Sequence, residues 1–437
     1  METLMDEIDT IPQDHGPKMR MWLERFGLVA QHPYIRSSDF ELASRQDEFL
    51  FYLRRRLKLT NPLSYSEALS RGSWFHAHAQ TLSDAPTISL PDQLKTRLEE
   101  LKTACDSLGI IGQKKVEILQ REEKDYQVAQ VWWQAIMSCT EPNAKAFLES
   151  FRCLGTEVGV RTIYRLGQAP IILAGIFDRL MLNEGDDSLW IADYKTTDEA
   201  PTIRLATAPV EFQSIQYLTI LALLLEEDWF LELYDLRPDT KVGGIIHVAF
   251  QKPSIDFCSK DRDFNLIKGP RGAIKKEYVG EPKLSNFTVR VRDWIMGEGE
   301  YLHLQPDIQR EPRVNWSIID AGLLLDDNRL KRYARDLEWL SSLANRPAYP
   351  ANFRQASHHL REYGKVSSWL PFYLNHPREW PDLIRRMGLQ IGENDARRDF
   401  IGPDLDTIIR NKRKSRGAKI AVSSLPEILG SHREEGE

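Results

Sequence analysis

The sequence predicts an α/β fold in which a mixed β-sheet core is flanked by helices. Three β-rich runs at 156–166, 170–182 and 188–196 are separated by the turn-forming segments GQAP and NEGDD, which predicts antiparallel hairpins. A helix over about 209–227 and a further strand at 242–250 follow these runs. The order strand–strand–strand–helix–strand, with helices before it, is typical of an α/β core around a mixed sheet.

Helical spacing of apolar residues comes before the strands. It covers residues 39–59 and begins again at 64–80. The first of these segments ends in a basic cluster that consists of Arg54, Arg55, Arg56 and Lys58. Residues 91–150 are helical in pattern throughout, and we interpret them as a helical insertion ahead of the sheet.

After the last predicted strand, residues 251–290 are polar and predicted to be irregular, and the chain is mostly helical in pattern from about 290 to 400. The final residues mix basic and acidic runs, as in a solvated tail. The predicted division is N-terminal helices with a histidine motif at 1–90, the insertion at 91–150, the core at 151–255, a mainly helical C-terminal region at 256–405 and a flexible tail at 406–437.

Charge, cysteine spacing and the length of apolar segments limit the classes of protein to which this chain can belong. A formal net charge of −6 neither supports nor excludes a nucleic-acid partner, so any such affinity requires local basic patches. The four cysteines have no CxxC spacing, which disfavours a disulfide framework or a zinc ribbon. The acidic N-terminus has no signal-peptide pattern, and the apolar stretch 218–225 is far shorter than the ~20 residues that span a bilayer. We therefore expect a cytoplasmic protein without a membrane partner.

Asp178, Asp193 and Lys195 form the strongest candidate site. Side chains alternate along a strand, so Asp193 and Lys195 project from one side of theirs. Asp178 interrupts an apolar row of the preceding strand, where an unpaired carboxylate is costly. If the two strands form a hairpin, both carboxylates converge beside the lysine. Such a pair favours a hard divalent cation, Mg²⁺ or Mn²⁺.

An ordinary structural explanation of the same residues is a buried Asp–Lys ion pair with a second Asp capping a turn. The triplet D-x-K is common, and by itself it favours that explanation. Three further motifs in the chain change the balance.

These motifs resemble those of the RecB-like PD-(D/E)xK nuclease family, in its phage-type exonuclease form. A histidine four residues after a glycine is followed by G-x-x-D-R, D-x-K-T and Q-x-x-x-Y. The matching residues are Gly72 and His76; Gly175, Asp178 and Arg179; Asp193, Lys195 and Thr196; Gln213 and Tyr217. The segment GGIIHVAFQKP also resembles the strand that follows in phage-encoded members, which favours a phage or prophage origin and hence a bacterial or phage-infected cell. The resemblance implies a restriction-endonuclease-like core.

The resemblance also implies roles for these residues. His76, Asp178 and Asp193 would bind the metal, and Lys195 would assist the attacking water. Gln213 and Tyr217, one helical turn apart, would hold DNA or the catalytic groups; without the other motifs they are as readily a helix surface with a part-buried tyrosine.

Other side chains near the motifs have competing interpretations. His78 is a rival to His76, but the two point about 200° apart on a helix, so both cannot face one ion. The spacing from Gly72 favours His76, and an ordinary helical histidine at either position is the alternative. Glu157 is either a further acidic contributor or a surface residue, and the sequence favours the surface position. His247, in a predicted strand, is interpreted as structural. Trp74 and Phe75 are expected in the core rather than stacked on bases.

Many RecB-like relatives hold a 4Fe–4S cluster through one cysteine before the histidine motif and three near the C-terminus. The corresponding segment at 349–377 keeps a similar aromatic frame without a cysteine. We therefore predict that this chain has no iron–sulfur cluster and that Trp369, Phe372 and Tyr373 close the segment by packing.

The expected function is metal-dependent hydrolysis of DNA phosphodiesters, in recombination, repair or phage genome processing, with exonuclease action implied by the resemblance. Two other classes remain open: a nuclease-fold module that binds DNA or protein without cutting, and a structural phage or assembly protein. Three basic stretches, at 54–58, 268–276 and 410–419, are candidates for the DNA backbone, and the first is favoured because it lies near a motif. No P-loop motif occurs, so a helicase or recombination protein would be a separate partner.

Overall fold

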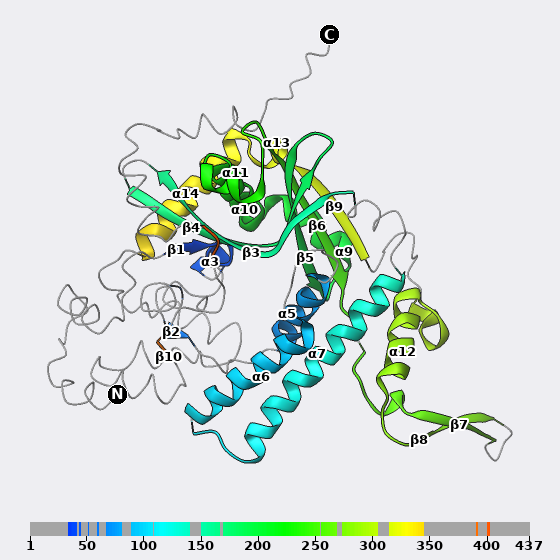
Figure 1. Ribbon diagram of the computed structural model, residues 1–437. Helices are drawn as coiled ribbons and strands as arrows, with labels where there is room; N and C mark the ends of the chain where they lie inside the picture. The colour runs from blue at the N-terminus through cyan, green and yellow to red at the C-terminus, as the bar shows by residue number, and fades with distance from the viewer. Residues whose placement is uncertain are drawn as a thin grey trace, which may run out of the picture.

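A mixed sheet lies between two helical layers in the computed structural model of the chain (Figure 1). The structure describes residues 34–41, 43–44, 51, 59–60, 67–80, 89–107, 109–139, 150–166, 169–253, 255–268, 273–304, 314–344, 390–391 and 400–402. The mixed sheet and its flanking helices confirm the predicted α/β class. None of the helices in the described ranges has the length and apolar character needed to cross a membrane.

The sheet has six strands, in the order β1-β4-β5-β6-β9, with β3 along the free edge of β4. Its members are β1 (Tyr34–Arg36), β3 (Arg152–Leu166), β4 (Ala169–Asn183), β5 (Ser188–Thr197), β6 (Lys241–Gln251) and β9 (Val314–Asp320). Strands β3, β4 and β5 pair antiparallel, as the turn residues predict. The β5–β6 pair is parallel, which requires a crossover, and helix α10 (Phe212–Leu224) lies within it.

One edge of β4 is shared by two strands. Strand β3 pairs with β4 from end to end, so β1 and β5 both lie on the opposite edge. Strand β1 pairs with residues 172–174 and β5 with residues 179–183. The stretch between them, residues 175–178, is therefore a gap in the sheet and ends at Asp178.

The first face of the sheet is covered by α10, α11 (Asp228–Tyr234), α13 (Ala321–Leu324) and α14 (Asp327–Ala344) (Figure 1). Helix α10 is apolar on nearly every side, with Leu218, Leu221 and Leu224 fully buried. Such a helix is stable only when it is enclosed, and α10 packs between the sheet and α14.

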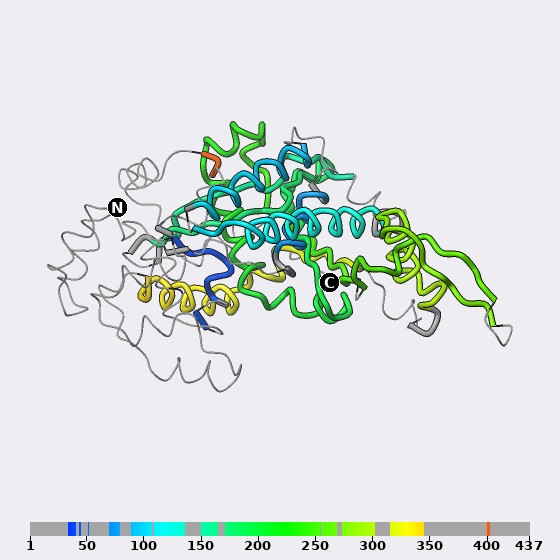
Figure 2. Tube along the Cα trace, turned by 90° about the horizontal axis from the view of Figure 1, so that it is seen from below, coloured from blue at the N-terminus to red at the C-terminus, as the bar shows by residue number. Residues whose placement is uncertain are grey.

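The opposite face carries α5 (Glu67–Gln80), α7 (Gln113–Cys139) and α12 (Leu284–Met296), with α6 (Leu90–Ser107) outside them. Trp74 and Phe75 are buried here, as expected, together with Trp132 and Trp133 of α7. Figure 2 shows α6 and α7 running side by side along the molecule. The two helices predicted within 91–150 are thus present, and α7 packs against both α5 and α12.

One expectation for the second half of the chain is wrong. The segment predicted to be irregular contains an antiparallel hairpin, β7 (Asp263–Lys268) and β8 (Ile274–Val279), preceded by the short 3₁₀ helix η4 (Ser259–Asp261). The described residues of the region predicted to be mostly helical do form mainly helices, and they also contribute strand β9, which pairs with β6. The remaining short elements are α3 (Ser37–Glu41), β2 (Leu59–Thr60), α9 (Pro201–Thr207), η3 (Ala208–Val210), η5 (Gly299–Leu304) and β10 (Gln390–Ile391).

Gly244 is predicted to be essential for the β6–β9 pairing. A Cβ at this position would lie 2.3 Å from the carbonyl oxygen of Ile319 in β9, and that oxygen cannot retreat without breaking the ladder. We expect Gly244→Ala to lower the free energy of unfolding by about 1–3 kcal/mol in chemical denaturation. Gly322→Ala, on α13 with open space around it, is the matched control and should be neutral. Equal stabilities of the two variants would contradict this packing.

Candidate active site

Asp178 and Asp193 lie where β4 and β5 separate. The last pair in the ladder between these strands is Arg179 with Ala192, so the two aspartates occupy the next positions. The backbone N–H of Tyr194 donates a hydrogen bond of 2.8 Å to Oδ2 of Asp178. A side-chain carboxylate thus accepts from the β5 backbone at the end of the ladder, which holds Asp178 at the gap in the sheet.

The carboxylate of Asp193 is buried and accepts three N–H donors. Oδ1 receives the ammonium of Lys195 at 2.9 Å and the amide of Gln213 at 3.3 Å, and Oδ2 receives Nδ1 of His247 at 3.0 Å. Burial raises the pKa of Asp193, but the charge of Lys195 and the hydrogen bond from His247 outweigh it and hold this pKa well below its usual range. The group is an anion whose position is fixed from three elements, β5, α10 and β6.

Lys195 and Tyr217 stay protonated in this setting. Burial lowers the pKa of Lys195, yet the charges of Asp193 and Asp178 raise it above its ordinary value. Burial and then the charge of Asp193 raise the pKa of Tyr217 to about 12. The site therefore contains a fixed ammonium group and a neutral phenol, both able to donate protons in hydrogen bonds at neutral pH.

Tyr217 reaches the site because residue 175 has no side chain. A Cβ on Gly175 would lie 3.3 Å from Cε1 of Tyr217 and 3.2 Å from Cδ1 of Ile220. Both values are tighter than ordinary contacts, so the glycine lets α10 lie close to β4 at the gap. The glycine, the aspartate three residues later and the tyrosine are therefore linked by packing.

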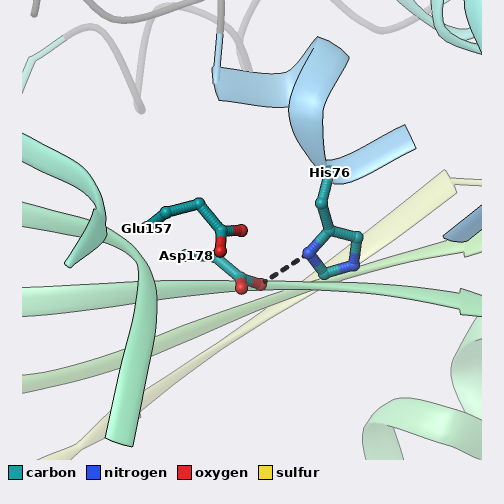
Figure 3. A group of neighbouring side chains, drawn as sticks. All are labelled: His76, Glu157 and Asp178. Atoms are coloured by element: carbon teal, nitrogen blue, oxygen red, sulfur yellow. Dashed lines mark ion pairs between the residues drawn. The ribbon is translucent and has the colours of Figure 1, made fainter. Parts of the chain in front are cut away.

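His76, Glu157 and Asp178 form a group that could hold a metal ion. One ligand atom from each residue lies within 4.8 Å of the others, and the three side chains are partly exposed. Figure 3 shows them pointing toward one another from α5, β3 and β4. Nδ1 of His76 lies 3.3 Å from Oδ2 of Asp178. Burial lowers the pKa of His76, but the charge and hydrogen bond of Asp178 raise it above its ordinary value.

Glu157 joins this group through an unusual backbone. Thr156 pairs with Arg179 and Val158 with Phe177, so Glu157 lies opposite Asp178. Its φ is +48°, in the left-handed region that costs a non-glycine residue of order 1 kcal/mol or more. The ladder also shifts register between Cys153 and Gly155. The surface position that the sequence favoured for Glu157 is therefore replaced by a place beside Asp178, at the cost of backbone strain.

The donor set suits a divalent cation. Two carboxylates side by side repel each other, and together with an imidazole they match the oxygen and nitrogen ligands that such ions accept. Asp193 lies outside the three-residue group, and its oxygens accept hydrogen bonds from Lys195, Gln213 and His247. Its role as a ligand remains a prediction.

His247 is a contact of the site that the sequence did not identify. Its ring is fully buried, with Nδ1 toward Asp193 and Nε2 3.1 Å from Oγ of Ser214. The parallel register sets Asp193 directly beside His247, so the sheet itself makes this contact. A histidine in an apolar strand gives no sign of its partner until that register is known.

The other sequence candidates divide into two groups. His78 points away from the site and packs against Tyr126, with ring centroids 5.4 Å apart, so His76 is the histidine that faces Asp178. The basic cluster formed by Arg54, Arg55, Arg56 and Lys58 lies outside the described residues, as does the segment at 349–377 that was compared with the iron–sulfur region.

Comparison with known proteins agrees with this geometry. The family model of the PD-(D/E)XK nuclease superfamily matches residues 47–292, more than half of the chain. One similar solved structure is described as the crystal structure of SSO0001; it has 14% sequence identity and a TM-score of 0.18 and covers 55% of this chain and 86% of its own. No curated protein matches. The matched residues include strands β3, β4, β5 and β6, helix α10 and every residue of the site. The chain belongs to the PD-(D/E)XK nuclease superfamily.

Proposed function

We propose that the chain is a Mg²⁺- or Mn²⁺-dependent deoxyribonuclease of the RecB-like type. This proposal rests on one observation: ligand atoms of His76, Glu157 and Asp178 lie within 4.8 Å of one another, beside the ion pair of the buried Asp193 with Lys195. A structural ion pair needs only one carboxylate per ammonium. His76, Glu157 and Asp178 are not needed for such an ion pair. Their presence at the same gap in the sheet is explained if the site binds a cation and a charged substrate.

The chain's own residues would do the following work. Glu157, Asp178 and His76 would hold the ion, with Asp193 as a further ligand. When bound, the ion supplies Lewis acidity toward a phosphodiester. Lys195 would present its ammonium to the charge that develops on the phosphate, or orient the attacking water. Tyr217 would donate from its neutral hydroxyl, and Gln213 would keep Asp193 in place.

Exonuclease action on DNA, with a role in recombination, repair or phage genome processing, is the finer form of this proposal and is implied by the resemblance to the RecB-like family. A separate helicase or recombination protein is the partner that this role would require. The alternative is a nuclease-fold module that binds DNA or protein without cutting it. The retention of Lys195 beside the carboxylates favours the enzyme, because a binding module has no use for a buried ammonium at that point.

The first prediction concerns cleavage. Linear and circular DNA are incubated with the protein and Mg²⁺ or Mn²⁺, and products are resolved on a gel. We expect metal-dependent cleavage that Lys195→Ala reduces by about 10²–10³-fold, because a preorganised charge is lost. Asp193→Asn should act in the same direction. Cleavage that survives both changes would place the catalytic centre elsewhere, and metal binding with no cleavage would favour the binding module. Degradation of linear DNA alone would support exonuclease action.

The second prediction separates metal binding from stability at residue 157. Glu157→Gly removes a carboxylate and also relieves a left-handed backbone. We expect Mn²⁺ affinity, measured by titration calorimetry, to fall by about 10-fold or more. The free energy of unfolding in metal-free buffer should rise by about 1 kcal/mol.

Asp235→Gly is the matched control for this change. Asp235 has φ +51° at the exposed C-terminal end of α11, so its replacement relieves similar strain away from the site. It should raise stability and leave the Mn²⁺ affinity unchanged. A Glu157→Gly protein with wild-type affinity would remove Glu157 from the metal centre.

The third prediction tests His247 as a positioning residue. His247→Leu removes the N–H donor from Asp193, whereas His247→Asn keeps a donor near the position of Nδ1. We expect the leucine variant to lose about 10–100-fold in kcat or in metal affinity and the asparagine variant to recover most of that loss. Thermal denaturation of both variants reports folding. Equal activities of the two variants at equal stability would show that the hydrogen bond to Asp193 does not matter.

A further inference from the structure

The β7–β8 hairpin leaves the body of the protein as an arm. It projects beyond α12 in both views (Figures 1 and 2). All twelve residues of the two strands are exposed. Six large apolar side chains are among them: Phe264, Leu266, Ile267, Ile274, Tyr278 and Val279, each 38–67% exposed. An isolated two-stranded ribbon with this much uncovered apolar surface is costly in water and indicates a binding surface.

The two faces of the arm differ in chemistry. Cross-strand register places Phe264 with Tyr278, Leu266 with Lys276 and Lys268 with Ile274 on one side, which we call the aromatic face. It carries two lysines and no acidic residue. The opposite face pairs Asp263 with Val279, Asn265 with Glu277 and Ile267 with Lys275, and thus has two acidic residues and one lysine. Positive charge and aromatic rings are therefore sorted onto one side.

The aromatic face is arranged around Phe264. The ring of Tyr278 meets that of Phe264 edge to face, with centroids 6.2 Å apart, and Nζ of Lys276 lies 4.4 Å from the centre of the Phe264 ring. An exposed ring with an ammonium group over one face offers a nucleotide both a ring on which a base can stack and a positive charge for its phosphate.

The base of the arm is fixed to the layer that carries the metal-binding histidine. Asp261, fully buried at the root of the hairpin, accepts two N–H groups of Arg290 in α12 at 2.8 and 2.7 Å. Helix α12 packs on α7, and α7 holds α5 through Arg71–Asp125 at 2.9 Å and Trp74–Glu122 at 3.0 Å. His76 lies on α5. The arm and the site are thus joined by one continuous set of packed helices.

We propose that the aromatic face of the β7–β8 arm binds a single strand of DNA. This rests on the proposed nuclease function and names a substrate contact away from the reacting phosphate. The bases of the strand stack on Phe264 and Tyr278, and Lys268 and Lys276 neutralise its phosphates. The ribbon holds the strand while α12, α7 and α5 fix its direction relative to His76.

The binding test uses the full chain in EDTA, so that cleavage cannot occur, and fluorescence anisotropy with a labelled single-stranded oligonucleotide. The double variant Phe264→Ala and Tyr278→Ala should weaken binding by about 10-fold or more, in line with the loss of base stacking. Lys276→Glu should weaken binding and reduce the salt dependence of Kd. Lys275→Glu is the matched control: it makes the same charge change on the neighbouring residue but on the opposite face, and its effect should be smaller.

A second readout separates the arm from the catalytic centre. A thymidine phosphodiester with a nitrophenyl leaving group is too small to reach the arm, so its hydrolysis should be unchanged in the arm variants. Cleavage of long DNA by the same variants should show a raised KM. Equal effects of Lys275→Glu and Lys276→Glu, or unchanged binding in the double variant, would overturn the arm proposal.

The outcomes also distinguish the two proposals from each other. A wild-type protein that cuts no nucleic acid refutes the nuclease while the oligonucleotide titration still tests the arm. A protein that cuts DNA normally in all arm variants refutes the arm alone. A change of oligomeric state in the Phe264 and Tyr278 variant, with DNA binding intact, would assign the face to a second copy of the chain and also overturn the proposal.

Discussion

The buried carboxylate of Asp193 is the constraint on which the site depends. An anion that is 1% exposed is costly to remove from water unless hydrogen bonds and an opposite charge replace the lost hydration. The replacements come from Lys195 two residues away, Gln213 on α10 and His247 on β6. These partners are in place only when α10 has docked and β6 has paired with β5. Formation of the core and assembly of the site are therefore one event.

The site also contains two unfavourable features, a repulsion between like charges and a strained backbone. Asp178 and Glu157 lie side by side with like charges, and Glu157 adopts a left-handed backbone to reach that position. Neither feature by itself stabilises the fold. Strain of this kind persists when surrounding structure imposes it, here the long β3–β4 ladder on both sides of Glu157.

The alternation of side chains between the two faces of a strand was enough to predict which residues of the site lie side by side on one strand. It placed Asp193 and Lys195 on one side of β5, and their 2.9 Å ion pair agrees with this. Glycine spacing selected His76 over His78, which packs against Tyr126 instead. These successes share a cause: each depends on residues close in sequence, where the geometry of one strand or helix fixes the relation.

Two kinds of feature could not be predicted from local sequence: the register between strands far apart in the chain, and an unusual backbone conformation at a single residue. The contact between His247 and Asp193 requires the parallel pairing of β5 with β6, and nothing local in VGGIIHVAF reports it. Glu157 appeared to be a surface residue because regular alternation cannot anticipate a positive φ at a glutamate. The β7–β8 hairpin lacks the apolar–polar alternation of a half-buried strand because both of its faces are exposed.

The site draws on both helical layers because it lies at a gap in the sheet between them. Asp193, Gln213 and Tyr217 are held from the α10 side, whereas His76 comes from α5 on the other face. A complete sheet would keep these groups apart. The division of one β4 edge between β1 and β5 therefore does more than end two ladders. At this gap His76 of one layer reaches Asp178, while Gln213 of the other layer contacts Asp193. Helix α7, which holds α5 in place, is consequently part of the support of the site rather than an addition to it.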